Sequence, residues 1–264
     1  MSFEYRPSWK NTSKYGKYMR YFAEYLKHGD FKSLGFSLKF MFTHKLPEQD
    51  YEASSSMGKF MIRKNTNDFQ FINYAYEKAI KDFFIANMDS FDVFIDVGAC
   101  IGEYDIWLAK KGKRCIAIEP ISYEGLRRNI SMNKVEDKIK VFPCGVGEKR
   151  ERVYFEIVDK NIGASHVERD VNKEPNVDIV PLDEILQQAG ISPDDRVIMK
   201  LDIEGMEPEA IAGGKEFISR QKNLRVIYEH FKEDNYRNDK ALLAISGFSF
   251  ENLDEVNRFA IKKA

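Results

Sequence analysis

The chain has 264 residues, of which 43% are hydrophobic and 31% are charged, and its net charge is −1. This balance excludes a disordered chain, and the length suits one large domain with an appendage. No run approaches the roughly 18 consecutive apolar residues that span a bilayer, and the N-terminus lacks the apolar stretch of a signal peptide. The three cysteines, Cys100, Cys115 and Cys144, fit neither a thiolate metal site nor a disulfide framework, so we expect a cytoplasmic protein.

The first 45 residues are basic and aromatic, whereas the remainder of the chain is acidic. They hold nine Lys or Arg residues against three acids, a net charge of +6, which leaves −7 for the rest. Aromatic residues recur among these bases at helical spacing, at Tyr15, Tyr18, Tyr21, Phe22 and Tyr25. The spacing predicts an amphipathic helix, either a cap docked by its aromatic stripe or an arm for RNA, an anionic membrane surface or an acidic substrate. We favour the cap, because aromatic stripes usually pack; such a segment can also dock on a second subunit.

Between this segment and the main domain, residues 54–57 are small and polar and predict a linker, and residues 58–65 alternate like a short strand. The spacing of apolar residues over 69–87 predicts a helix that leads into the next strand. We therefore divide the chain into a helical N-terminal cap or arm, residues 1–85, and a main domain, residues 86–264.

The main domain opens with an apolar strand, a glycine turn, a helix and a second strand that ends in an acid. The strand and turn are Val93 to Gly102, VFIDVGACIG, the helix passes through Tyr104 and Leu108, and the second strand is Cys115 to Pro120, CIAIEP. This is the order of the front half of a nucleotide-binding βαβ unit, and it predicts a cofactor that contains adenosine.

Strands and helices go on alternating towards the C-terminus. Further strands are predicted at 139–144, 197–202 and 224–228, a hairpin at 152–157, regular structure at 177–186, and helices beginning near 122, 208 and 241. A polar segment without a clear period, residues 159–176, has the length of a substrate lid. Residues 247–253 and 258–263 predict a closing antiparallel pair. The alternation predicts an α/β fold with a doubly wound, mostly parallel sheet.

The glycine turn distinguishes between adenosine cofactors. A dinucleotide turn has the pattern G-x-G-x-x-G, in which the second glycine admits the pyrophosphate and the third lets the helix pack on the strand. Here Gly98 and Gly102 are present, but Cys100 and Glu103 occupy the other two positions. Glu103 also places a negative charge where a phosphate would bind, so NAD is disfavoured.

S-adenosylmethionine fits the same turn better, because it carries no phosphate and tolerates nearby acids. We expect Asp96 to face its methionine end, directly or through water, and Glu119 to accept hydrogen bonds from both ribose hydroxyls.

Several sequence blocks between Phe94 and Glu229 match one family pattern. VFIDVGACIGEY matches D-x-G-A-N-x-G-x-Y, IEP is followed by Leu126, Asn129 and Asn133, NIGAS (161–165) matches an N-x-G loop, VPLDEIL fits next, and KLDIEGMEPEAIAGG (200–214) matches K-x-D-x-E-G-x-E. Together these blocks resemble the FkbM-type S-adenosylmethionine-dependent methyltransferases, although Cys100 stands where that family usually has Asn. The resemblance implies a class I methyltransferase domain, a mostly parallel seven-stranded Rossmann-like sheet with a C-terminal antiparallel hairpin. The N-terminal helical extension lies outside the resemblance.

The activity that the resemblance implies is in-line methyl transfer to a hydroxyl group of a small molecule or sugar. Such a hydroxyl needs a base, and the candidates at the ends of the fourth and fifth core strands are Asp202, Glu204, Glu229 and His230. The predicted cofactor contacts are Asp96, Gly98, Ala99, Cys100, Gly102, Tyr104, Glu119, Pro120, Cys144, Gly145 and Asp202. No metal is predicted, because nothing fixes a third ligand beside His230 and a carboxylate.

Two other functions stay open at this point. One is an RNA methyltransferase that uses the basic N-terminal arm, although the place after the fourth strand reads DIEG rather than the polar-proline-aromatic tetrapeptide that usually accompanies a base acceptor. The other is a protein that binds S-adenosylmethionine without catalysis and acts through its N-terminal helices as an interaction module.

Overall fold

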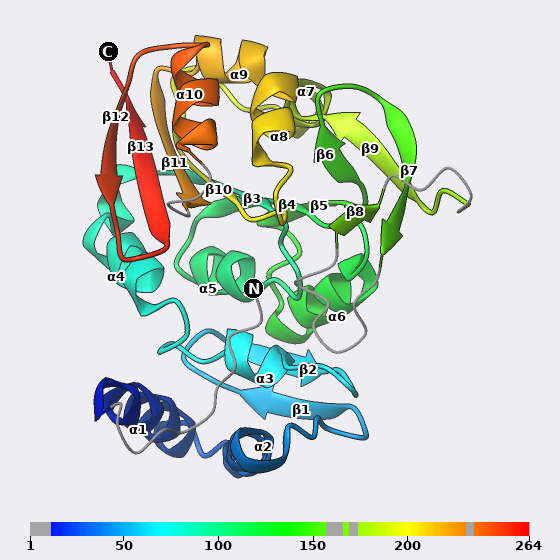
Figure 1. The fold of residues 1–264 in the computed structure, drawn as a ribbon, viewed down its shortest axis with the longest axis vertical. Coiled ribbons are helices and arrows are strands. Elements are labelled where there is room, and N and C mark those ends of the chain that lie inside the picture. The colour runs from blue at the N-terminus through cyan, green and yellow to red at the C-terminus, as the bar shows by residue number, and fades with distance from the viewer. Residues whose placement is uncertain (1–11, 157–165, 169–173, 231–234, 264) are drawn as a thin grey trace.

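The computed structural model describes residues 12–156, 166–168, 174–230 and 235–263 (Figure 1). The N-x-G loop at 161–165 and most of the predicted lid, residues 159–176, fall outside these ranges. No helix in the described ranges is long and apolar enough to cross a bilayer. The three cysteines are free thiols.

A seven-stranded sheet forms the centre of the molecule, in the order β12-β13-β11-β10-β3-β4-β5. Its strands are β3 (Val93–Val97), β4 (Arg114–Ile118), β5 (Ile139–Phe142), β10 (Arg196–Leu201), β11 (Asn223–Glu229), β12 (Phe248–Asn252) and β13 (Asn257–Lys262). β13 runs antiparallel to both of its neighbours, while β5, β4, β3, β10 and β11 are parallel. The expected doubly wound, mostly parallel sheet with a closing antiparallel pair is confirmed.

Helices cover both faces of this sheet. One face carries α4 (Lys78–Ala86), α5 (Glu103–Lys110) and α6 (Tyr123–Asn133), and the other carries α7 (Leu182–Ala189), α8 (Glu207–Gly213), α9 (Lys215–Arg220) and α10 (Arg237–Leu243) (Figure 1). Neighbouring residues of a strand point to opposite faces, so Phe94 packs in the α4–α6 core while Ile95 packs in the α7–α10 core. The central strands are apolar because both faces are buried.

Before the sheet, the chain forms a helical pair and a small β-hairpin. These elements are α1 (Thr12–Lys27), α2 (Phe31–Thr43), β1 (Tyr51–Ser54), β2 (Lys59–Ile62), α3 (Asp68–Phe71) and the 3₁₀ helix η1 (Met88–Ser90). Two aromatic residues of α1 pack inward: Tyr21 and Tyr25 are buried, and the Tyr25 hydroxyl donates to the Phe69 carbonyl at 2.7 Å.

Two details of this region differ from the sequence expectation. Residues 54–57, predicted as a linker, belong to the hairpin, where the Ser55 N–H closes the turn on the Gly58 carbonyl at 2.9 Å. The single helix predicted over 69–87 is two helices, because the chain turns between α3 and α4. Glu77, directly before α4, has a left-handed backbone with φ of 46°, which no residue inside a right-handed helix can adopt.

A second small sheet is inserted between β5 and β10. Its strands are β6 (Gly145–Gly147), β7 (Glu151–Glu156), β8 (His166–Glu168) and β9 (Val177–Pro181), in the order β6-β9-β7-β8. Residues 152–156 of the predicted hairpin instead lie in one strand, β7, which pairs with both β8 and β9. β9 in turn brings residue 179 opposite residue 145. This pairing builds one wall of the pocket described next.

Candidate cofactor and active site

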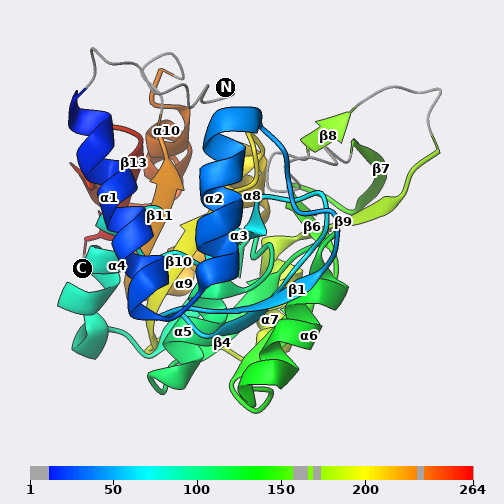
Figure 2. The ribbon, with the colours of Figure 1, turned by 90° about the horizontal axis from the view of Figure 1, so that it is seen from below.

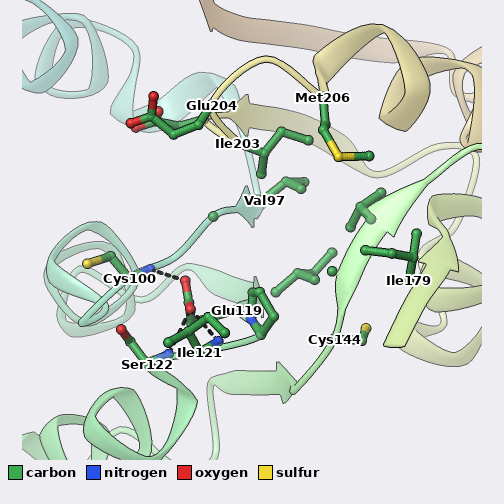
Figure 3. A pocket seen from close by; sticks show the side chains of 16 residues that line it. Val97, Cys100, Glu119, Ile121, Ser122, Cys144, Ile179, Ile203, Glu204 and Met206 are labelled. Carbon is green, nitrogen blue, oxygen red and sulfur yellow. Dashed lines mark hydrogen bonds between the residues drawn. The ribbon is translucent and has the colours of Figure 1, made fainter. Parts of the chain in front are cut away.

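A pocket opens at the carboxyl ends of β3, β4 and β10, where doubly wound sheets bind ligands (Figure 3). Eight of its described lining residues were expected at the site: Gly98, Cys100, Glu119, Pro120, Cys144, Gly145, Asp202 and Glu204. Eight more were not: Val97, Ile118, Ile121, Ser122, Val146, Ile179, Ile203 and Met206. The unexpected residues are almost all apolar.

The turn after β3 requires glycine at two of the predicted positions. Gly98 has φ of 95°, and a Cβ there would lie 2.0 Å from the Asp202 carbonyl oxygen. Gly102 has φ of 81°, and its Cβ would lie 2.2 Å from Leu126 Cδ1 of α6. L-residues with a side chain rarely adopt either conformation, and neither site has room. The two glycines therefore bring β3 close to β10 and α5 close to α6.

Cys100 occupies the middle of this turn in a left-handed conformation, with φ of 47°. Asn adopts this conformation more readily than other residues with a side chain, which gives a physical reason for Asn at the family position. The Cys100 backbone faces the pocket floor, while its thiol points away from Glu119 (Figure 3). Burial raises the pKa of this thiol well above its usual range, so it is not a reactive thiolate.

Glu119 follows β4 and holds the two turns at the pocket together. Its Oε2 accepts from the Cys100 N–H at 3.0 Å, and its Oε1 accepts from the N–H groups of Ile121 at 2.7 Å and Ser122 at 2.8 Å (Figure 3). Burial raises the pKa of Glu119, and the three backbone donors oppose that rise. A carboxylate has about four acceptor positions, so Oε2 retains capacity for a further donor.

The lining carries negative charge and apolar surface. Among its described residues, Glu119, Asp202 and Glu204 are carboxylates, and none is Lys or Arg. Such a lining repels a pyrophosphate, whereas a ligand with hydroxyls, an apolar ring and positive charge suits it. These residues fit S-adenosylmethionine.

Four predicted cofactor contacts lie outside the described lining, in the layer of residues that supports it. Asp96, Ala99 and Tyr104 are buried, and Gly102 is the N-cap of α5. Asp96 lies on the strand position opposite Lys200, towards α5, rather than at the strand end. Its contact with the methionine end of the cofactor stays a prediction.

Asp96 belongs to a buried cluster of acids beneath the pocket. Burial raises the pKa of Asp96 to about 7 and that of Glu103 to about 8, and it raises the pKa of Asp105 well above the usual range. Neither carboxyl oxygen of Asp105 has a hydrogen-bond partner among the described residues. Burial raises the pKa of Asp105, and the nearby charges of Asp96 and Glu103 raise it further, so its protonated form is favoured. Lys200, also buried, favours the ionised form of Asp96.

The family model described as the methyltransferase FkbM domain matches residues 96–259, which contain the whole pocket. The chain belongs to the FkbM methyltransferase family. An FkbM methyltransferase structure from Methylobacillus flagellatus is 26% identical, with a TM-score of 0.45, over 66% of this chain and 44% of that one. This chain therefore spans less than half of that protein.

Two other solved structures are more distant. An O-methyltransferase from Bacillus cereus is 12% identical, with a TM-score of 0.42, over 70% of this chain and 80% of that one. A Pyrococcus abyssi tRNA (uracil-54, C5)-methyltransferase is 13% identical, with a TM-score of 0.43, over 81% of this chain and 43% of that one. No curated protein matches the chain.

The candidate bases of this member of the FkbM family differ in their surroundings. The Asp202 carboxylate is 2.6 Å from Lys200 Nζ, in an ion pair at the pocket edge. Glu204 is exposed, with φ of 51°. Glu229 is half-buried, and burial together with the nearby charge of Asp202 raises its pKa to about 8. His230 stacks on Tyr236, with ring centres 4.6 Å apart. Among the described residues, no group of three or more candidate ligands could hold a metal ion.

The N-terminal region also reaches the pocket, which sequence reasoning missed. Arg63, directly after β2, donates from Nη1 to the Ser122 hydroxyl at 2.6 Å and pairs with buried Asp68 at 2.7 Å. Its Nη2 lies 4.0 Å from Cys100 Sγ. Arg63 therefore braces both turns that Glu119 connects. A lone Arg after a short strand gives no sequence signal for such a role.

Proposed function

We propose that this protein is an S-adenosylmethionine-dependent methyltransferase that methylates a hydroxyl group of a small molecule or sugar. The proposal depends on the position of Glu119, a buried carboxylate that accepts hydrogen bonds from three backbone N–H groups at the floor of the pocket. The described lining of this pocket contains no Lys or Arg side chain. In this proposal Oε2 accepts from a ribose hydroxyl. The apolar side chains of Ile121, Ile179 and Met206 exclude water around the cofactor.

When bound, the cofactor supplies a methyl group on a sulfonium, whose C–S bond breaks as an acceptor oxygen forms the new C–O bond. The chain must hold that oxygen in line and remove its proton. Glu229 and His230 lie outside the described pocket lining, but the charges of Asp202 and Glu204, which do line it, act on Glu229. Of the candidate bases we favour Glu229, because it neighbours the pocket edge and a carboxyl with a pKa of about 8 is more basic than an ordinary one. Asp202 forms an ion pair with Lys200, so in this proposal it holds the pocket edge in place and does not act as the base.

The charge of the pocket supports a hydroxylated small molecule or glycan over RNA. Asp202 and Glu204 lie at its edge, where a phosphate backbone would approach. An RNA substrate would instead show binding that falls steeply with salt. Binding of the cofactor without transfer to any member of a broad acceptor panel would support a non-catalytic role.

Calorimetric titration with S-adenosylmethionine, S-adenosylhomocysteine and NAD tests the cofactor assignment. We expect the first two to bind and NAD to fail. Glu119→Gln should weaken S-adenosylmethionine binding about tenfold or more, because a hydrogen bond to a charged group contributes about 1.5–3 kcal/mol. The matched control is Glu124→Gln, an exposed carboxyl on α6. Equal affinity of both variants would remove Glu119 from the site, and tight NAD binding would overturn the cofactor assignment.

A panel of hydroxylated small molecules and glycans, assayed with methyl-labelled cofactor, tests the acceptor class. Label recovered on an acceptor oxygen supports the proposal. Transfer to RNA alone would replace it with the RNA alternative.

A further inference from the structure

The outward surface of α1 and α2 is apolar, although the same helices pack well on their inner side. Figure 2 shows the two helices side by side across one end of the molecule. Of the eight exposed large hydrophobic side chains in the described part of the chain, five lie here: Met19, Leu26, Phe31, Leu38 and Phe42. Phe31 is 68% exposed and Phe42 is 72% exposed. This set contains none of the aromatic residues of the predicted stripe, of which Tyr21 and Tyr25 are buried.

The five residues form one stripe on each helix, opposite the buried side. Met19 and Leu26 are seven residues apart on α1, as are Phe31 and Leu38 on α2, and Phe42 follows one turn later. Residues at these spacings share one helix face. The inward residues at the same levels, Tyr21 and Tyr25 on α1 and Ser33 on α2, are buried. We call this outward surface the apolar face.

Basic side chains border the apolar face in a matching pattern. Each of four apolar residues is followed directly by a base, giving the exposed side chains Arg20, Lys27, Lys32 and Lys39. The two acids of the helical pair turn inward, since the side chain of Glu24 is 13% exposed and Asp30 is buried. Glu48 lies 3.9 Å from Lys39, but both side chains are exposed and such a pair contributes little.

This combination points to one partner. We propose that the apolar face binds an anionic membrane surface, with Phe31 and Phe42 entering the boundary between headgroups and acyl chains and the bases contacting lipid phosphates. A second copy of the chain is disfavoured, because two such faces would bring like charges together. RNA is disfavoured because it would bury none of the exposed Phe, Leu and Met side chains in an apolar environment.

Co-sedimentation with vesicles tests the proposal on the full chain. We expect binding to vesicles of equal parts phosphatidylglycerol and phosphatidylcholine, weak binding to phosphatidylcholine alone, and a decrease with added salt. Phe31→Ser with Phe42→Ser should weaken binding at least about tenfold. Lys32→Gln with Lys39→Gln should weaken it about thirtyfold at low salt, because each base near an anionic surface contributes about 1 kcal/mol.

The matched control is Ile85→Ser with Leu243→Ser, which removes exposed apolar side chains outside the apolar face. It should leave vesicle binding unchanged, and all three double variants should bind S-adenosylmethionine as the parent does, so the test is independent of the proposed function. No binding to anionic vesicles at low salt would overturn the proposal. An equal loss of vesicle binding in the control variant would also overturn it. A parent protein that is a dimer, and that Phe31→Ser with Phe42→Ser converts to a monomer, would show that the apolar face binds a second copy of the chain instead.

Discussion

At the scale of single residues, Glu229 shows how neighbours set the chemistry of a carboxyl group. It ends β11 beside Asp202 and Glu204, whose negative charges add to the effect of burial and raise its pKa to about 8. A general base works best when its pKa is near the working pH. Near neutrality most Glu229 side chains hold a proton, so only the ionised fraction can act as the base.

Glu229→Gln should therefore lower kcat about a hundredfold or more and change the pH profile. In the parent protein, activity should rise as the pH increases through about 8, because the base must lose its proton first. The variant should lack this rise. Initial rates across pH with the best acceptor from the panel measure both effects, and Glu255→Gln, an exposed carboxyl in the neighbouring turn, is the control. A pH rise that persists in Glu229→Gln and disappears in His230→Gln would assign the base to His230.

At the scale of elements, the hairpin β1–β2 is attached to the main domain by side-chain amides of α6. The buried Asn129 accepts from the Met61 N–H at 2.8 Å and donates to the Ile101 carbonyl at 3.0 Å. One side chain thus connects β2, α6 and the turn after β3. Asn133 makes a similar pair of bonds to the backbone of Lys59, in a more exposed position.

Asn129→Ala should destabilise the protein by about 2–4 kcal/mol, because it leaves a buried N–H and a buried carbonyl without partners. Asn133→Ala should cost about 1 kcal/mol or less, since water can replace its bonds. Urea unfolding measures both. Cofactor binding should also weaken in Asn129→Ala, because the turn that carries Cys100 loses its anchor. Equal and small costs for the two variants would show that the hairpin does not depend on Asn129.

The main sheet could be predicted because its strands are apolar runs that end at glycines or acids, and such runs need no knowledge of distant partners. The pocket wall that contains Ile179 could not be predicted, because it depends on the pairing of β9 with β6 and not on the local sequence around Ile179. The turn at 54–57 resembled a linker because β1, Tyr51–Ser54, is too short to show alternation. Asp96 and Glu119 are both acids at the positions where the sequence pattern of a cofactor-binding βαβ unit predicts them. Asp96 lies within β3, where the alternation of side chains along the strand turns it towards α5, whereas Glu119 lies beyond the end of β4 and reaches the pocket.

At the scale of the whole molecule, the folded state keeps several acids away from water. Burial raises the pKa of Asp96 from 3.8 to about 7, and the pKa values of Glu103 and Glu229 from 4.5 to about 8. At pH values between the ordinary and the raised pKa values of these acids, the folded protein binds more protons than the unfolded chain does. Stability then decreases as pH rises, by up to about 1.4 kcal/mol per pH unit for each proton. Lys81, whose pKa burial lowers to about 8, is protonated in both states below that pH and does not alter the sign.

The melting temperature should therefore fall steadily between about pH 5 and pH 8, although most proteins change little there. Glu103→Gln should reduce this slope, because it removes one of the groups that must lose a buried proton, and it should raise the melting temperature at the upper end of the range. Glu136→Gln, which replaces an exposed carboxyl, should leave the slope as it is. Scanning calorimetry at several pH values measures the slope. A melting temperature that rises from pH 5 to pH 8 would show that these acids are already ionised in the folded protein, with Lys200 and Lys81 compensating their charge inside the core.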